Sequence, residues 1–569
     1  YKHEKMLRAF NTLYAEYEII KNLKFKTTFS YDYTTVKGEK WYDPRTSNGE
    51  DENGEVVKRI REYKKMVWSN TLSYLTTFNN IHHLDFLAGY EIDDTYNDYL
   101  SGEAYNFTTP DKHAISNGMK TVSVGGSDSR YRLVSYLSRL NYDYKNKYYL
   151  GASFRVDGSS RLHRDNRWGT FWSVSGAWRT IEEEFMQPVK DWLTDLRIRA
   201  SYGVNGTLPS DYFGYMGLSS ISGGYLEQPG IQMSQIANPN LKWETNYNMN
   251  IGLDFGFWDR LNFTIEYYTR TTKNLLMDCP VSMTTGFSSY LMNIGEVKNK
   301  GIELTINSTN IKIKDFNWNT TFNLGHNSNK VVKLDGEQTQ IVSGTQIHKV
   351  GSSYRTFYVQ EFAGINPETG NPLFYTNELD ENGNYIKEIT ENSKNAQFIP
   401  YKHAEPTVNG GISNSLRYKW LDLNFLFSYQ FGGYSYDTWA QKTEHGGYDS
   451  YANIPTYYRD SWKKPGDQTN IEVYMPGKSS SVSMHKITSS RRIHSTDYFR
   501  LKNITFGITL PKEWTNKINI GNVRFYASAS NLWTWAAYDN YDPEAVSAGS
   551  ATQTTPPLKT VTFGLNINF

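Results

Sequence analysis

The chain has 569 residues, a formal net charge of +1 and a mean hydropathy of −0.63. Such a small net charge gives no electrostatic basis for nucleic-acid binding, and no stretch approaches the roughly 18 consecutive apolar residues of a transmembrane helix. Tyr, Phe and Trp make up 15% of the residues, an excess that the aromatic girdles of a membrane β-barrel would use.

Segments in which apolar and polar residues alternate recur along the whole chain, and this period of two is typical of β-strands. In chain order, the pattern predicts strands over residues 13–19, 23–33, 68–78, 84–90, 134–144, 148–156, 170–178, 196–202, 249–257, 261–267, 302–308, 316–324, 408–416, 421–429, 499–510, 523–529 and 560–569. A change of register near Lys502-Asn503 predicts a β-bulge.

The connections between these segments are alternately short and long. Short ones include 79–82, 145–147 and 258–260, and the long ones lie near 34–65, 92–130, 157–169, 203–246, 272–298, 326–406, 432–497 and 534–557. Short turns on one side and long loops on the other are typical of outer-membrane barrels. We therefore predict an all-β fold, a transmembrane antiparallel β-barrel with large extracellular loops near 203–246, 326–406 and 432–497.

The last predicted strand shows the clearest alternation. Every odd position is apolar and every even one is polar or Gly, so one set of side chains is expected to face lipid and the other the lumen. The outward set is Val561, Phe563, Leu565, Ile567 and Phe569, and the inward set is Thr562, Asn566 and Asn568.

The predicted strands number about 17, and the first of them begins on the outer side, whereas bacterial barrels have even strand numbers. Large plugged transporters have about 22 strands, so we expect about five strands and any plug to precede Tyr1. Residues 1–569 are then a barrel domain that is incomplete at its N-terminus, without a signal peptide. The strand over 558–569 is expected to pair with a strand upstream of Tyr1 rather than with 13–19.

The sequence carries no motif for catalysis. It lacks a G-x-x-x-x-G-K-[ST] loop, a G-x-S-x-G elbow and an H-E-x-x-H pair, so we predict that the protein is not an enzyme and holds no cofactor or metal. His82 and His83 are adjacent on one strand and point to opposite faces, so they cannot share a metal ion. The single Cys279 cannot form an intrachain disulfide.

Three acidic segments leave alternatives open. Residues 51–54 and 380–383 both read Asp-Glu-Asn-Gly, which suits either calcium ligands or a hairpin turn. The Gly comes too early for an EF-hand loop, which favours the hairpin. Asp93, Asp94 and Asp98 could bind a cation, but a solvated loop is the more common setting for such a cluster.

A series of short motifs runs through most of the chain. The motifs are Asn141-Tyr142-Asp143-Tyr144, 154–161 (Phe-Arg-Val-Asp-Gly-Ser-Ser-Arg), Asn166-Arg167-Trp168-Gly169, 173–179, 196–203, 238–244, 299–304, Tyr498-Phe499-Arg500-Leu501-Lys502-Asn503, Ser530-Asn531-Leu532 and Tyr541-Asp542-Pro543-Glu544. In order and spacing they resemble the barrel of the SusC-like TonB-dependent transporters of Bacteroidetes, over roughly residues 130 to 569. Most of these residues also suit an architectural role in turns or at membrane interfaces.

The resemblance implies import of oligomeric nutrients across the bacterial outer membrane, with glycan oligosaccharides as the first substrate class and peptides as the second. It also implies a SusD-like surface lipoprotein as partner and energy from the TonB complex, acting through a plug that this sequence lacks. Outer-membrane lipid surrounds such a barrel, and nucleic acid is not expected as a partner. The alternatives are a siderophore-type TonB receptor, a passive porin and, less favoured, a surface-binding adhesin barrel.

The two longest predicted loops are the candidates for ligand binding. The loop over 432–497 is rich in Tyr and Trp beside Asp and Asn, and aromatic faces stack on sugars or pack on peptide side chains. We expect it, together with 326–406, to contact a SusD-like partner and to form part of the substrate cavity. The residues predicted to bind substrate are Tyr434, Tyr436, Asp437 and Trp439, and the alternative is that they only brace the loop.

Overall fold

The computed structural model describes residues 1–225, 228–334, 339–447, 453–476, 487–518, 520–546, 548–551 and 554–568. Within these residues, seventeen strands form one large antiparallel sheet, so the predicted all-β fold is confirmed. No helix in this part of the chain is long and apolar enough to cross a membrane. The chain divides into two compact units: unit 1 is Tyr1–Trp178, Arg199–Asn248 and Thr272–Ile294, and unit 2 is Arg179–Ile198, Met249–Thr271 and Gly295–Phe569.

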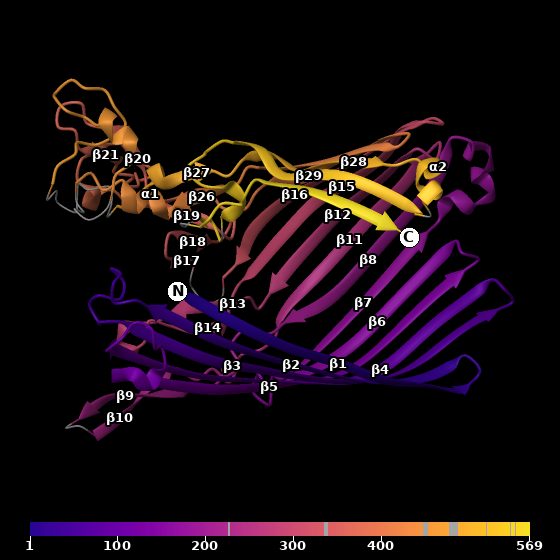
Figure 1. The fold of residues 1–569 in the computed structure, drawn as a ribbon, viewed down its shortest axis with the longest axis horizontal. Helices are drawn as coiled ribbons and strands as arrows, with labels where there is room; N and C mark the ends of the chain where they lie inside the picture. The colour runs from indigo at the N-terminus through magenta and orange to yellow at the C-terminus, as the bar shows by residue number, and fades with distance from the viewer. Residues whose placement is uncertain are drawn as a thin grey trace. The chain divides into compact units, whose positions relative to one another are not determined.

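Unit 1 is built from long antiparallel strands, each paired with the next one in the chain (Figure 1, indigo to purple). They are β1 (Lys2–Ile20), β2 (Leu23–Tyr42), β3 (Glu55–Phe78), β4 (His82–Phe107), β5 (Gly118–Tyr144), β6 (Tyr148–Ser159) and β7 (Trp168–Trp178). Two small hairpins join β9 (Leu218–Tyr225) to β10 (Gln228–Gln235) and β13 (Leu276–Pro280) to β14 (Ser289–Asn293). Strands β8 (Leu193–Thr207), β11 (Glu244–Phe257) and β12 (Leu261–Lys273) contribute residues to both units.

Unit 2 combines shorter strands of the large sheet with folded loops. Its paired strands are β15 (Glu296–Lys312), β16 (Phe316–Lys333), β24 (Val408–Tyr418), β25 (Leu421–Phe431), β28 (Tyr498–Thr509), β29 (Asn522–Ala536) and β31 (Thr560–Asn568). The loops form three small sheets: β17 (Gln340–Ser343), β18 (Gln346–Lys349), β19 (Thr356–Gln360) and β23 (Phe398–His403); β20 (Phe362–Ile365), β21 (Pro372–Tyr375) and β22 (Ile389–Thr390); and β26 (Tyr434–Asp437), β27 (Ile493–Ser495) and β30 (Ser550–Ala551). Helix α1 (Thr438–Thr443) follows β26. Helix α2 (Lys512–Thr515) lies in the short connection between β28 and β29, at the ends of these two strands that are far from α1 (Figure 1).

The strand registers keep apolar and polar residues on separate faces. Residues directly opposite each other in an antiparallel pair share a face, and Leu565 lies opposite Phe525, which lies opposite Ile508. One position further along, Asn566 lies opposite Arg524, whose guanidinium donates to Asp422 at 2.6 Å. The alternation of the last strand is therefore shared with its neighbours. Which face meets lipid stays a prediction, and Phe569 lies outside the described residues.

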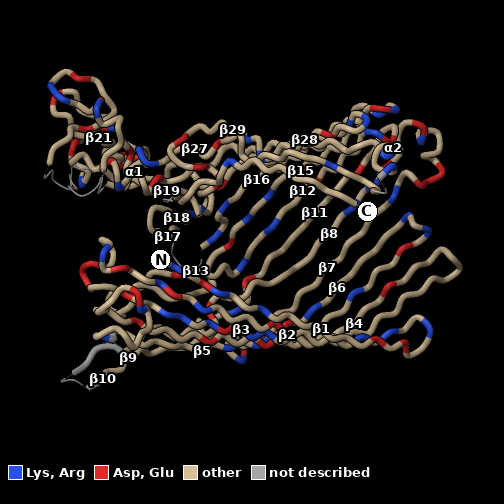
Figure 2. The backbone as a smooth tube through the Cα atoms, in the orientation of Figure 1, with Lys and Arg blue, Asp and Glu red and all other residues tan. Residues whose placement is uncertain are grey.

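The predicted loops over 34–65 and 92–130 are wrong for most of their length, because β2 to β5 continue through them. Charged residues replace the apolar ones there, but the backbone ladder continues because opposite charges face each other across strands. Lys65 lies 2.7 Å from Asp93, and Arg132 lies 2.7 Å from Asp94. Figure 2 shows acidic and basic residues interleaved along these strands. Asp93 and Asp94 are thus ion-paired with residues of β3 and β5, and all three aspartates lie on β4 and not in a loop.

Several local predictions are confirmed. Both registers next to β28 shift at Lys502, as a bulge requires. The carboxylate of Asp380 accepts the backbone N–H groups of Asn382 and Asn384, and Leu379 bridges Tyr385, so residues 380–383 form a hairpin turn. Residues 51–54 likewise turn between β2 and β3, with Asn53 and Gly54 at positive φ.

Candidate functional site

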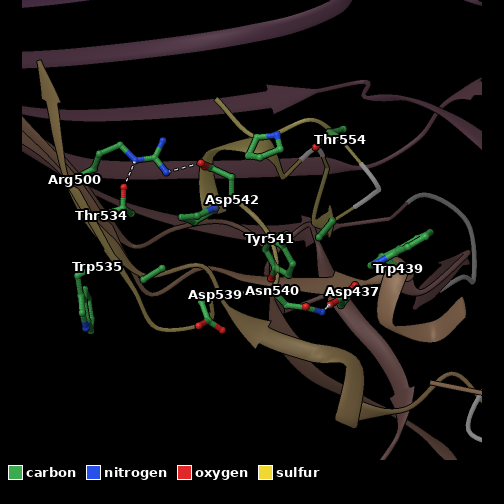
Figure 3. A pocket seen from close by; sticks show the side chains of 14 residues that line it. Asp437, Trp439, Arg500, Thr534, Trp535, Asp539, Asn540, Tyr541, Asp542 and Thr554 are labelled. Carbon is green, nitrogen blue, oxygen red and sulfur yellow. Dashed lines mark hydrogen bonds and ion pairs between the residues drawn. The ribbon is translucent and has the colours of Figure 1, made fainter. Parts of the chain in front are cut away.

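A cavity of about 630 Å³ opens among the loop segments of unit 2 (Figure 3). Four stretches of chain meet around it: the end of β26 with α1, strand β28, the end of β29 with the residues that follow it, and the segment around β30. Its lining residues are Asp437, Trp439, Arg500, Thr534, Trp535, Ala536, Asp539, Asn540, Tyr541, Asp542, Pro543, Ala551, Thr554 and Pro556.

Asp437 forms hydrogen bonds with two of these stretches, helix α1 and the residues that follow β29. It caps helix α1 by accepting the backbone N–H of Ala440 at 2.8 Å, as Asp does at many helix N-termini. The same carboxylate accepts from the hydroxyl of Tyr538 at 3.0 Å and from the side-chain amide of Asn540 at 3.1 Å. Asp437 is fully buried, so its role in this geometry is to position α1 against the segment 538–540.

Two exposed indole rings belong to residues near the cavity. Trp439, the second residue of α1, is 37% exposed, and Trp535, at the end of β29, is 49% exposed. Trp535 pairs with Phe499, whereas Thr534 pairs with Arg500, so the ring of Trp535 lies on the other face of the sheet and points away from the cavity (Figure 3). The ring of Trp439 offers the cavity an apolar face with an N–H at its edge, which suits a ligand that has both apolar and polar parts.

Arg500 anchors the segment after β29. Its three guanidinium nitrogens donate to Thr534 at 2.9 Å, to Asp542 at 2.6 Å and to Glu544, and Lys502 also reaches Glu544 at 2.6 Å. The side chain of Arg500 is almost completely buried, and a buried charge of this kind requires such partners. These contacts join two of the motifs quoted from the sequence, 498–503 and 541–544.

Asp539 differs from the other two lining aspartates. Its side chain is exposed, and within the described part of the chain its carboxylate has no hydrogen bond or ion pair. A ligand in the cavity would therefore meet Asp539 as an uncompensated negative charge.

The aromatic residues behind the cavity are neutral at neutral pH. Burial raises the pKa of Tyr541 to about 12, and its hydroxyl contacts that of Ser435. Burial, with the charge of Asp437, raises the pKa of Tyr538, whose ring stacks on His494 at a centroid distance of 3.7 Å. Burial also lowers the pKa of His494 to about 4.

A second group of buried charges lies in the same loops. Glu472 is fully buried, accepts from the hydroxyl of Tyr458 at 3.1 Å and lies 3.3 Å from Arg491. Arg492, 1% exposed, pairs with Glu444 at the end of α1. Burial lowers the pKa of Arg492 to about 10. This network links α1, residues 456–475 and residues 490–492.

The structure separates the four residues predicted to bind substrate. Asp437 and Trp439 line the cavity, whereas Tyr436 is 1% exposed in an apolar cluster with Phe357, Val359 and Ile493. Tyr434 is half-buried, with the ammonium of Lys402 5.2 Å from its ring centre. Of the four, Trp439 alone is exposed to solvent, and a binding role for any of them stays a prediction.

Sequence reasoning missed Trp535, Asp539 and Asn540 as members of the site. They lie about 100 residues from Asp437 along the chain, and the pairings of β28 with β29 and of β26 with β30 bring the segments together. The motif 541–544 was the available signal, since it follows directly after them.

Comparisons with known proteins agree on one family. Residues 7–386 match the family model "TonB dependent receptor-like, beta-barrel". TonB-dependent receptor P3 of Formosa agariphila is 32% identical over 98% of this chain and 57% of its own length, and TonB-dependent receptor SusC of Bacteroides thetaiotaomicron is 29% identical over 91% of this chain and 51% of its own length. The solved structure of the RagAB peptide transporter superposes with a TM-score of 0.89 at 26% identity, covering 100% of this chain and 62% of that chain. The chain thus spans between half and two thirds of the length of these proteins.

Proposed function

This chain belongs to the TonB-dependent receptor-like β-barrel family, and from that membership we propose that it forms the barrel wall and outer loops of a transporter for oligomeric nutrients. The sequence resemblance to SusC-like receptors is confirmed, and the family places the protein in the bacterial outer membrane. The relatives are named as receptors and transporters, not as enzymes, and the protein is assigned no catalytic activity.

The cavity among the folded loops of unit 2 is the single observation that carries the proposal. A cavity of about 630 Å³ lies in the size range of small-molecule sites, and the exposed indole of Trp439 and several polar groups lie around it. On the proposed orientation the loops near 203–246, 326–406 and 432–497 are extracellular, so this cavity would face the medium that supplies the substrate.

We propose a surface lipoprotein of the SusD type as partner, contacting the loops 326–406 and 432–497. Support comes from exposed apolar residues on the hairpin between β21 and β22: Leu379 is 61% exposed and Ile389 is 58% exposed. Exposed apolar side chains gathered on one hairpin are typical of protein-binding surfaces. Energy from the TonB complex is part of the same proposal.

The substrate is proposed as an oligomer of sugars or amino acids. Exposed indole rings stack on sugar faces and also pack against peptide side chains, so Trp439 suits both classes. The two classes differ in charge, because most glycan fragments are uncharged whereas peptides carry amino, guanidinium and carboxylate groups.

Uptake in living cells tests the proposal. A strain that lacks the gene is compared with its complemented parent for uptake of labelled peptides and oligosaccharides, each with and without a functional TonB complex. We expect uptake of at least one oligomer class to require both the gene and TonB. Uptake that persists without TonB would indicate a passive porin, and uptake restricted to ferric siderophores would replace the proposal with a siderophore receptor.

A further inference from the structure

We propose that the cavity beside α1 binds a cationic group, the amine or guanidinium of a basic peptide. This inference rests on the proposed import function and names its substrate class, a peptide that carries basic residues and not a neutral glycan.

The charges that line the cavity are mostly negative. Three lining residues are aspartates, Asp437, Asp539 and Asp542, and the cation among the lining residues is Arg500. Just beyond the lining, Glu544 and Lys502 contact each other and add no net charge. The excess of carboxylates around the cavity favours a cation over a neutral or anionic ligand.

The internal bonds decide which of these charges a ligand can use. The three guanidinium nitrogens of Arg500 already donate hydrogen bonds to Thr534, Asp542 and Glu544. Asp437 is buried and accepts three hydrogen bonds. Asp539 is left exposed, so it can form a charge-assisted hydrogen bond with an incoming ammonium or guanidinium group.

The indole of Trp439 strengthens the same preference. A cation over the face of Trp gains more from the ring than over Tyr or Phe, and Trp439 exposes ring surface beside the cavity. The hydroxyl of Thr534, which accepts a hydrogen bond from Arg500, can still donate to a peptide carbonyl, and the lining residue Thr554 offers a second hydroxyl. An aromatic face, a free carboxylate and small hydroxyls together suit a basic side chain on a peptide backbone.

An organic cation fits this cavity better than a metal ion. Hard cations such as Ca²⁺ need six or more oxygen ligands, usually with several carboxylates. Within the described residues, no group of three or more His, Cys, Asp or Glu side chains is arranged to hold a metal. Asp437 and Asp542 already satisfy protein donors, which leaves one free carboxylate.

The test uses the full-length transporter purified with its partner lipoprotein. Three probes are titrated: the pentapeptide Ala-Ala-Lys-Ala-Ala with both ends blocked, the same peptide with its Lys acetylated, and maltohexaose. We expect the lysyl peptide to bind, acetylation to weaken it about tenfold, and Asp539→Asn to weaken the lysyl peptide roughly three- to tenfold without changing the acetylated one. The matched control Asp315→Asn removes the same charge from the turn between β15 and β16 and is expected to leave binding unchanged.

Two outcomes overturn the inference. One is failure of the lysyl peptide to bind, and the other is equal binding of the lysyl and acetylated peptides in wild type and Asp539→Asn. If maltohexaose binds in their place, the cation site is wrong and oligomer import stands. If no peptide or oligosaccharide binds or enters cells, the proposed function fails as well.

Discussion

The long strands of unit 1 and the folded loops of unit 2 accommodate polar residues in different ways. In unit 1, β3 to β5 run for 24 to 27 residues each, and charged residues stay in the ladder through cross-strand ion pairs. In unit 2, β24, β25 and β28 have 11 or 12 residues, and the long loops between strands of this unit fold into small sheets with fully buried side chains such as Phe357 and Phe374. Extended strands need no core of their own, whereas compact loops do.

This difference follows from what the backbone requires. A strand that continues satisfies its N–H and C=O groups on the neighbouring strand, so its side chains need only tolerate water. A long connection without such a neighbour must bury apolar side chains to offset the entropy of ordering. Even the far end of β2 to β4 closes over a small cluster that contains Trp41, Val56 and Phe107.

The largest expected effect is on the core of a folded loop. Phe374→Ala removes a fully buried ring and is expected to cost about 3–5 kcal/mol of local stability. The matched change Ile60→Ala, at a residue of β3 that is 41% exposed, is expected to cost under about 1 kcal/mol. Backbone hydrogen exchange at residues 372–375 and at residues 55–65 measures the loss of local stability in each variant. Equal loss of protection in the two regions would contradict the claim that the loops depend on buried cores whereas the long strands depend on backbone pairing.

The lipid-facing prediction for β31 is next in size. Leu565→Arg is expected to cost about 2–4 kcal/mol near mid-membrane, and Asn566→Arg much less, because only the first charge enters lipid. The full-length barrel is unfolded by denaturant in lipid vesicles to measure both. Equal costs would show that the register of β31 is assigned to the wrong faces.

Lowering the pH is expected to reduce the local stability of the loops around the cavity. Burial holds the folded-state pKa of His494 near 4, below its usual value of about 6.5. The neutral ring therefore contributes stability that is present above about pH 6.5 and is lost as the pH falls toward 4, by at most about 3 kcal/mol.

Hydrogen exchange at β26 and β27, corrected for intrinsic rates, is compared at pH 7 and pH 5 to follow this loss. His494→Phe keeps a ring to stack on Tyr538 but cannot titrate, so the loss of protection at pH 5 should disappear in it. Unchanged protection of the wild type between the two pH values would show that the ring is not held neutral by the fold.

The smallest effect concerns single ion pairs of unit 1. Lys65→Ala breaks the pair with Asp93 but leaves the backbone ladder intact, so the expected cost is about 0–1 kcal/mol. Denaturant unfolding measures it, with Lys21→Ala in the turn after β1 as the control. A cost of several kcal/mol would mean that β3 and β4 depend on individual pairs and not on the ladder as a whole.

The fold was largely predictable and the site only in part. The alternation of apolar and polar residues predicted the strands and the bulge at Lys502, because the two faces of a strand are visible as a period of two in the local sequence. Strand ends were misplaced in β2 to β5, since residues such as Lys65 and Asp93 look like loop residues until their cross-strand partners are known. Trp439, which lines the cavity, was among the predicted residues because aromatic residues cluster next to β25, and its binding role stays a prediction. The place of Asp539 in the cavity depends on pairing between distant segments, which local pattern does not encode.

Binding by the Trp439→Ala variant of the full-length transporter tests the role of the cavity most directly. The ring is partly exposed, so we expect the affinity for the peptide or oligosaccharide that the wild type binds to fall at least about tenfold while the melting temperature is unchanged. Trp514→Ala, which removes an exposed ring from α2, is the control and should alter neither. Unchanged binding together with a lowered melting temperature in Trp439→Ala would mean that the residue only braces the loop, and would contradict the assignment of this cavity to the substrate.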